Sequence, residues 1–468
     1  MTKILRGRPF LRHSFALILG NLGAKGGGLA LSVLFAAYLG KEGLGVLSLA
    51  NSAYFLGLTL GGSGLSTVVS IVYSKHKSNG VLRKAFLVAL LFSIPAMAAL
   101  FLLSSPISLF MLKTTEVSYA LKIAALSIPF VAISSCIKGF FYSENKLFPV
   151  PSAQIFEQLV RLLVIFLLFR FPLPYFPITK VFISVLAGEV FSTVYLSVFY
   201  LFHKNPKGRS SISSSNKVYT SELLSLALPQ SLVSSLTSVL RWAEDLLLLA
   251  GLTFFFGGVK SSALSFIGAF SGIVMPILFI PSPLFSGLLL LIVPKASELS
   301  SAGQTRRLSA TASKLCGFCL AAGTVFAVFI ICFGRNIIAL LYPSAAGNAA
   351  VYLMSVAFIS PLMYFEGGVT SILTGIGEQN QVLRISIYDC IIRVVLVVVL
   401  CPIFGEWGFV IMMWVSNLWT SAVNFRRLRA ALSGGVRVSV MDSVLLPGVA
   451  AAVVCMGVKV LGEALRVV

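Results

Sequence analysis

Charged residues are scarce in this chain. They make up 11% of its 468 residues, whereas a soluble domain needs roughly 25% to cover its surface. Hydrophobic residues account for 57% of the chain, and its mean hydropathy is +0.97. A soluble protein of this length is therefore excluded. Apolar runs of about 20 residues recur from end to end, which is typical of a polytopic helical membrane protein.

The sequence also lacks the features of a catalytic membrane enzyme such as a glycosyltransferase. No long hydrophilic domain is available to hold a nucleotide sugar, and no DxD or P-loop pattern occurs. Cys316 and Cys319 form a CxxC pattern, but neither a second CxxC nor a nearby His accompanies it. We therefore expect these cysteines to be small packing residues, and we expect no catalytic residue, metal or other cofactor.

The apolar runs predict an all-α polytopic membrane protein with about 13 spans. The first run is too long and too rich in glycine for a cleaved signal peptide, so it counts as a span. The predicted spans are 13–39, 44–73, 84–110, 117–143, 149–171, 177–202, 222–252, 261–291, 309–333, 349–373, 383–403, 407–425 and 442–461. The predicted organisation is an N-terminal six-helix lobe (1–202), a polar cytoplasmic linker (203–220), a C-terminal six-helix lobe (221–430) and an additional helix (431–468).

Lys and Arg are distributed unequally between the two sides of this topology. With a cytoplasmic N-terminus, 22 of the 36 lie on the cytoplasmic side, 8 lie on the opposite side and 6 lie within spans. This asymmetry supports a bacterial plasma-membrane protein in that orientation. It also explains the net charge of +21 without nucleic acid as a partner, because basic loops face an anionic lipid leaflet.

A carboxylate and an arginine stand four residues apart inside two of the apolar runs. The pairs are Glu157 with Arg161 and Asp389 with Arg393. Each Arg lies 32 residues after a proline in an earlier apolar segment, so the whole pattern recurs at an offset of 232 residues, about half the chain. The recurrence predicts two related lobes that enter the membrane in the same direction, with a cavity between them.

Two interpretations of these charge pairs are open, because i,i+4 spacing places both groups on one helix face. Each pair could be an ion pair that neutralises itself and packs between helices. Alternatively, Arg161 and Arg393 could line opposing lobes of the cavity and bind a diphosphate, with Glu157 and Asp389 orienting them. Guanidinium suits phosphate because its planar fork donates two hydrogen bonds at once. A charge facing lipid costs about 2.5–3.5 kcal/mol at mid-bilayer, which disfavours a lipid-facing position.

The first and seventh spans carry further charged candidates. Lys25 lies in a glycine-rich part of the first span and is either a cation of the cavity or a side chain that extends to the membrane interface. Arg241 shares a helix face with Glu244 and Asp245 in the seventh span. These two acids are candidates for binding a coupling cation, and pairing with Arg241 is the alternative.

Polar residues complete the candidate cavity. Asn51 and Gln154 could hydrogen-bond to sugar hydroxyls or bridge neighbouring helices. Glu189 and Glu366 are further acids within spans, and the sequence assigns them no individual role. Acids in such positions are expected to line a wet cavity, to pair with bases or to lie near the interface.

The segment GFFYSENKLFPVPSAQIFEQLVRLLVI (139–165) resembles the stage V sporulation protein B and lipid II flippase branch of the MOP transporter superfamily. In that branch, a glycine-aromatic turn precedes a proline-containing helix with an EQxxR motif. The resemblance extends to residues 38–70, 290–299 and 401–410. It implies two six-helix lobes, alternating access and a central cavity that contains basic residues of the first helix, here Lys25. Many relatives in the branch have fourteen spans, one more than predicted here.

Two functions follow from the residues and the resemblance. The first is a flippase, acting as a monomer, that moves a polyprenyl diphosphate-linked oligosaccharide or peptidoglycan precursor from the inner to the outer leaflet, driven by the membrane potential or by Na⁺ or H⁺. The alternative is a Na⁺- or H⁺-coupled exporter of drugs or metabolites. The net charge of the cavity discriminates between them, because a phosphate flippase needs a basic cavity and an exporter of cationic drugs an acidic one. Lys25 and the paired arginines favour the flippase.

Overall fold

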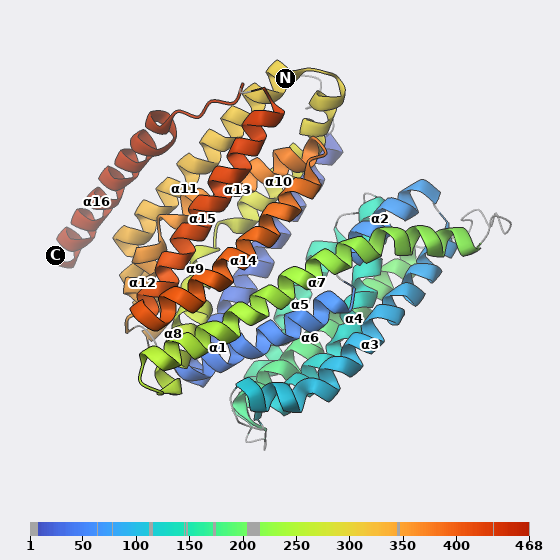
Figure 1. Cartoon of the computed structure of the whole chain (residues 1–468), viewed down its shortest axis with the longest axis horizontal. Coiled ribbons are helices and arrows are strands. Elements are labelled where there is room, and N and C mark those ends of the chain that lie inside the picture. The colour runs from blue at the N-terminus through green and yellow to red at the C-terminus, as the bar shows by residue number, and fades with distance from the viewer. Residues whose placement is uncertain are drawn as a thin grey trace. The chain divides into compact units, whose positions relative to one another are not determined.

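The computed structural model describes residues 8–62, 64–76, 78–111, 116–144, 146, 148–171, 175–203, 216–343, 347–433 and 435–467. Within these ranges the chain is almost entirely helical and contains no β-strand (Figure 1). The chain divides into two compact units. Unit 1 comprises Met1–Leu39 and Val46–Leu246, and unit 2 comprises Gly40–Gly45 and Leu247–Val468.

Unit 1 contains the first six helices and most of the seventh. They are α1 (Arg8–Leu60), α2 (Leu65–His76), α3 (Asn79–Met111), α4 (Glu116–Ser143), α5 (Pro149–Arg170), α6 (Pro177–His203) and α7 (Asn216–Phe255). The backbone leaves the helical conformation at Gly40, with φ 66° and ψ −174°. Glycine adopts this conformation without steric cost, so α1 consists of two helices that meet at this residue.

Unit 2 contains the end of α7 and the remaining helices. They are α8 (Lys260–Ala269), α9 (Met275–Leu278), α10 (Ser282–Ser301), α11 (Thr305–Leu341), α12 (Ala349–Val356), α13 (Ile359–Gly375), α14 (Gln379–Phe404), α15 (Glu406–Ala431) and α16 (Leu446–Val467). Two short π-helical segments, Phe270–Val274 and Met441–Leu445, precede α9 and α16. Such segments are local irregularities inside longer helices.

The described residues include 11 helices that are long and apolar enough to cross a membrane, or up to 12 if one bent pair counts as a span. The first two predicted spans fall in one such stretch, Gly20–His76, which is broken at Gly40. The predicted eighth span, 261–291, is two helices, because the chain turns at Pro281 between α9 and α10. The predicted twelfth span coincides with α15, which is not among the 11. The all-helical, polytopic membrane fold is confirmed.

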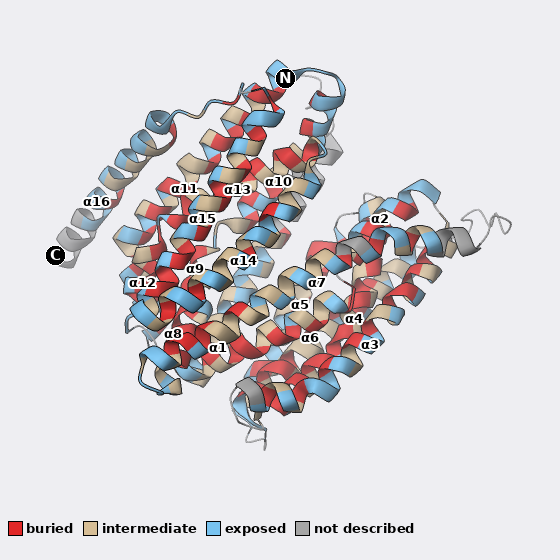
Figure 2. Ribbon diagram, viewed as in Figure 1, coloured by how far each residue is buried: buried red, intermediate tan, exposed pale blue. Residues whose placement is uncertain are grey.

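Small side chains bring the helices of each unit together. Lipid tails are as apolar as Leu, so helices in a membrane gain their stability from close packing rather than from leaving water. In unit 1, α4 is the most buried helix, and its buried residues include Ala120, Ala124, Ala132 and Gly139. Buried residues lie mainly along the helix faces that pack within each unit, and exposed residues lie on the other faces (Figure 2).

The predicted division into lobes stays a prediction. Most of the predicted linker, residues 204–215, lies outside the described residues. The helix that follows it, α7, belongs to unit 1 as far as Leu246 and to unit 2 from Leu247. The cytoplasmic position of the N-terminus also stays a prediction.

Candidate functional site

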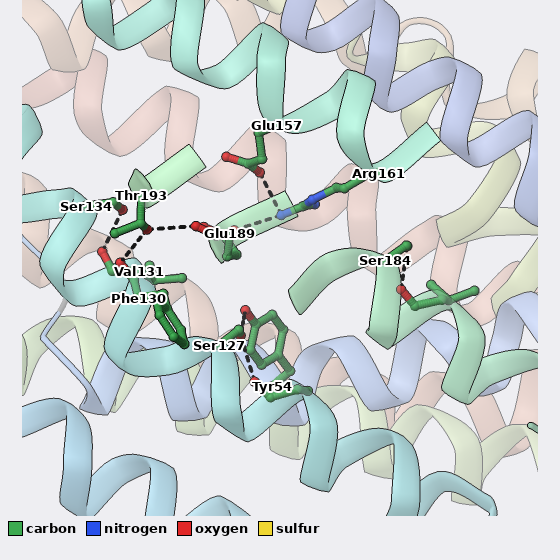
Figure 3. A network of polar contacts seen from close by, with 12 residues as sticks. Tyr54, Ser127, Phe130, Val131, Ser134, Glu157, Arg161, Ser184, Glu189 and Thr193 are labelled. Carbon is green, nitrogen blue, oxygen red and sulfur yellow. Dashed lines mark hydrogen bonds and ion pairs between the residues drawn. The ribbon is translucent and has the colours of Figure 1, made fainter. Parts of the chain in front are cut away.

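Arg161 lies between two carboxylates in unit 1 (Figure 3). Its Nη2 is 2.7 Å from Oε1 of Glu157, one turn earlier on α5, and 2.7 Å from Oε1 of Glu189 on α6. The three side chains retain only 18%, 11% and 13% of their accessible surface, respectively. These are short, charge-assisted contacts. The predicted i,i+4 neighbours therefore form an ion pair, and a second helix adds another acid to it.

Gly188 makes this arrangement possible. A Cβ atom on Gly188 would lie 2.6 Å from Cγ of Arg161 and 2.8 Å from its Nε, closer than such atoms pack. The stem of Arg161 therefore lies directly on the α6 backbone. Its Nε is buried and has no hydrogen-bond partner among the described residues, because it faces this glycine.

Polar contacts extend from Glu189 to α4. Thr193, one turn after Glu189, donates hydrogen bonds from Oγ1 to the carbonyl oxygens of Glu189 (2.7 Å) and Phe130 (3.1 Å). The hydroxyls of Tyr54 and Ser127 are 2.6 Å apart in the same region (Figure 3). Ser127 also donates a hydrogen bond to the carbonyl oxygen of Ala124, so these hydroxyls add to the hydrogen bonds of α4 on both sides of Pro129.

A second basic residue acts on this group of side chains. Lys138, on α4, acts electrostatically on Glu189. Two acids, Glu157 and Glu189, are thus combined with two bases, Arg161 and Lys138. Removing one partner from such a buried group leaves an uncompensated charge. This lowers the free energy of unfolding much more than removing all of the charged side chains together.

Unit 2 assembles a different polar group around Asp389. Oδ1 of Asp389 accepts a 2.6 Å hydrogen bond from Ser416 on α15. Glu366, on α13, accepts hydrogen bonds from Thr420 (3.1 Å) and from the amide nitrogen of Asn424 (3.4 Å), both on α15. Asp389 also acts electrostatically on Glu366. Three helices therefore place two carboxylates, two hydroxyls and one amide together.

The two polar groups differ because the second acid of each group comes from a different helix of the repeat. At the offset of 232 residues, Ser134 on α4 corresponds to Glu366 on α13, and Glu189 on α6 corresponds to Ser421 on α15. Arg393, on the same helix as Asp389, is half-buried. The sequence singles out Glu189 and Glu366 as acids within spans, but it gives no sign of their partners.

Lys25 lies in surroundings different from those of Arg161. A Cβ on Gly27 would lie 2.7 Å from Cβ of Gln158 on α5, and Gly23 faces Ile155 on the same helix. Since successive helix residues are rotated by about 100°, Lys25 lies on the side of α1 opposite to these two glycines. Its side chain is exposed.

The remaining candidates are placed individually. Asn51 on α1 and Gln154 on α5 are half-buried. Arg241 on α7 is exposed, whereas Glu244 retains 4% of its accessible surface and Asp245 is half-buried. Among the residues that the structure describes, no three His, Cys, Asp or Glu side chains are grouped closely enough to hold a metal ion.

Comparisons with known proteins identify the family and the fold of this chain. It is 25% identical to stage V sporulation protein B of Bacillus subtilis (strain 168) over 418 residues, which cover 86% of this chain and 80% of that protein. Its fold matches lipid II flippase MurJ in an inward closed conformation, with a TM-score of 0.72, 13% identity, and 96% and 92% of the two chains covered.

A second solved structure has the same fold. It is an inward-facing multidrug resistance MATE family transporter of the MOP superfamily, with a TM-score of 0.64 and 14% identity over 91% of this chain and 94% of that one. The polysaccharide biosynthesis protein family matches residues 10–300, more than half of the chain. This chain is therefore a multi-pass membrane protein of the polysaccharide biosynthesis protein family.

Proposed function

We propose that this protein flips a polyprenyl diphosphate-linked oligosaccharide or peptidoglycan precursor from the inner to the outer leaflet of a bacterial plasma membrane. The observation that carries the proposal is the alignment with stage V sporulation protein B over 86% of the chain. The fold match to a lipid II flippase supports the same substrate class. In the proposed orientation the N-terminus is cytoplasmic, because 22 of the 36 Lys and Arg then face the cytoplasm.

The membrane potential favours outward movement of such a substrate. A diphosphate in a diester carries about two negative charges, and each charge moved out of a negative interior releases about 2.3 kcal/mol per 100 mV. Two charges therefore gain about 4.6 kcal/mol at 100 mV. The protein has only to provide a polar, basic path for the head group while the polyprenyl tail stays in lipid.

We assign the first contact with the diphosphate to Lys25. It is exposed, and it lies on the face of α1 that points away from α5. Arg241, exposed on α7, is the second such cation. Asn51 and Gln154 are the proposed partners of sugar hydroxyls, since both are half-buried polar residues of helices within unit 1.

Arg161 and Arg393 are assigned a conditional role as diphosphate ligands. Arg161 already pairs with Glu157 and Glu189 at 2.7 Å. A diphosphate would therefore have to replace one of these carboxylates, and the displaced acid would need a proton or another base. Such an exchange would bind the substrate in only one state of the transport cycle.

A complementation experiment separates these assignments. A strain that depends on this protein would carry Lys25→Ala, Arg161→Ala or Arg393→Ala, with membrane expression measured in each case. We expect export of the glycan to fall at least tenfold for Lys25→Ala and for the Arg variants. Unchanged export in all three variants at equal expression would refute the proposed diphosphate ligands.

The co-purifying lipid identifies the substrate directly. Native mass spectrometry of the purified protein should show a monomer that carries a mass corresponding to a polyprenyl diphosphate glycan. A protein that never retains such a lipid, under conditions that keep phospholipid bound, would argue against this substrate class.

Cation-coupled export is the second candidate function. The acids Glu366 and Asp389, the hydroxyls of Ser416 and Thr420, and Asn424, whose Oδ1 is buried with no partner among the described residues, favour it. Oxygen ligands of this kind suit hard cations. The predicted acids Glu244 and Asp245 remain alternative coupling residues.

The test of this alternative is transport driven by an imposed Na⁺ or H⁺ gradient. Cation coupling predicts that Glu366→Gln and Asp389→Asn uncouple transport from the gradient. Glu378→Gln is the matched control, because Glu378 pairs with Arg427 at 2.8 Å elsewhere in unit 2. If the transport rate of the unmodified protein depends on neither the Na⁺ nor the H⁺ gradient, this alternative is excluded.

A further inference from the structure

The last helix, α16, packs along α11 in a fixed register. A Cβ on Gly317 of α11 would lie 3.0 Å from Oγ of Ser443, and a Cβ on Gly448 would lie 3.3 Å from Cγ2 of Thr324. Later residues of one segment therefore meet later residues of the other, so the two helices run in the same direction. The small residues at these points let the backbones approach closely.

The same register brings two cysteines together further toward the C-terminal ends of α11 and α16. Cys332 follows Thr324 by eight residues, and Cys455 follows Gly448 by seven. The side chains of Cys332 and Cys455 lie close enough to interact. Neither cysteine is in a disulfide, Cys332 is half-buried and Cys455 is buried against its neighbours. Two thiols in contact across a helix pair have the proximity that a disulfide requires.

We propose that Cys332 and Cys455 form a disulfide site that fastens α16 to α11. The oxidant is a protein or small-molecule disulfide of the type RS–SR. The thiolate of one cysteine attacks this disulfide and releases one RSH, and the other cysteine then attacks the mixed disulfide and releases the second. The two cysteines together lose two protons and two electrons, and the two RSH molecules gain these protons and electrons.

A basic residue follows each cysteine. Arg335 follows Cys332 by three residues, Lys459 follows Cys455 by four, and both basic side chains are exposed. Long basic side chains within a span extend toward the membrane interface, so the two thiols lie toward that interface. Water and a dissolved disulfide can reach that depth more readily than the middle of the bilayer.

The inference rests on the orientation given under Proposed function. With a cytoplasmic N-terminus, Arg335 and Lys459 both lie on the outer side, where disulfides persist. Cys316 and Cys319 do not offer the same chemistry. They are three residues apart on one helix and both are buried in the core of unit 2.

A covalent bond here would matter because α16 is otherwise weakly held. Its principal packing partner is α11, and much of its apolar surface is exposed (Figure 2). The exposed residues of this helix include Val449, Val453, Val454, Met456 and Val458. The disulfide would keep α16 in place on α11 through any movement of the other helices.

The test counts oxidised thiols in the full-length protein. Right-side-out membrane vesicles are treated with oxidised glutathione, which does not cross membranes, and free thiols are then blocked with N-ethylmaleimide. After reduction, a polyethylene glycol maleimide labels the thiols that had been oxidised. We expect two labels per chain. In Cys332→Ser or Cys455→Ser we expect at most one label, from a mixed disulfide between the remaining cysteine and glutathione. Cys401→Ser, a change at a buried cysteine of α14, should keep both labels.

The other outcomes are equally decisive. Labelling that requires a membrane-permeant oxidant such as diamide would support the cysteine pair and overturn the orientation. No paired labelling with either oxidant, or two labels that survive in both single variants, would overturn the pair itself. Glycan export by the Cys332→Ser variant is measured separately, so failure of the disulfide and failure of the proposed function give different results.

Discussion

Replacing Gly188 by Ala tests whether Arg161 depends on the close approach of α5 and α6. The added Cβ would lie 2.6 Å from Cγ of Arg161, so the arginine has to move. Overpacking of this kind costs about 1–3 kcal/mol. The movement also weakens the 2.7 Å contacts to Glu157 and Glu189, and polar interactions between membrane helices contribute about 0.6 kcal/mol each. Together the free energy of unfolding should fall by about 2–4 kcal/mol.

The assay is reversible unfolding of the purified protein in mixed detergent micelles, with Gly188→Ala and Arg161→Ala made singly and together. If the Gly188→Ala substitution acts by displacing Arg161, its effect should shrink to about 0.5 kcal/mol or less once Arg161 is absent. Gly28→Ala is the control, because a Cβ there has no other atom within 4 Å. An equal loss from Gly188→Ala with and without Arg161 would refute this account of the packing.

Two further substitutions test other contacts. Replacing Glu157 and Glu189 together by Gln leaves Arg161 without its acids and should cost about 3–5 kcal/mol in the same unfolding assay; a loss under about 1 kcal/mol would mean that other groups neutralise the guanidinium. Tyr352→Phe removes a hydrogen bond to Glu406 and should cost about 1 kcal/mol without changing glycan export, and an export defect at normal expression would contradict this purely structural role.

The membrane class and the pairing of Glu157 with Arg161 could be predicted because they depend on local properties of the sequence. Apolar runs of spanning length indicate transmembrane helices directly. The i,i+4 spacing of Glu157 and Arg161 brings the two groups together on any helix, and they do form an ion pair. The eighth predicted span was less accurate, because the turn at Pro281 divides it into two helices.

The partners from other helices could not be predicted. Glu189 reaches Arg161 because α6 packs against α5 at Gly188, and this contact depends on tertiary structure. The repeat does not include the second acid of each group, which comes from α6 in unit 1 and from α13 in unit 2.

Transport by the purified protein in liposomes tests the central proposal most directly. A fluorescent polyprenyl diphosphate sugar is placed in the membrane, and an impermeant reagent reports how much of it reaches the opposite leaflet. We predict protein-dependent flipping that accelerates when the potential favours anion movement in that direction and falls at least tenfold with Lys25→Ala. The flippase assignment would be contradicted by two results together. The substrate flips no faster than in empty liposomes, and the same protein still exchanges Na⁺ or H⁺ for a cationic drug.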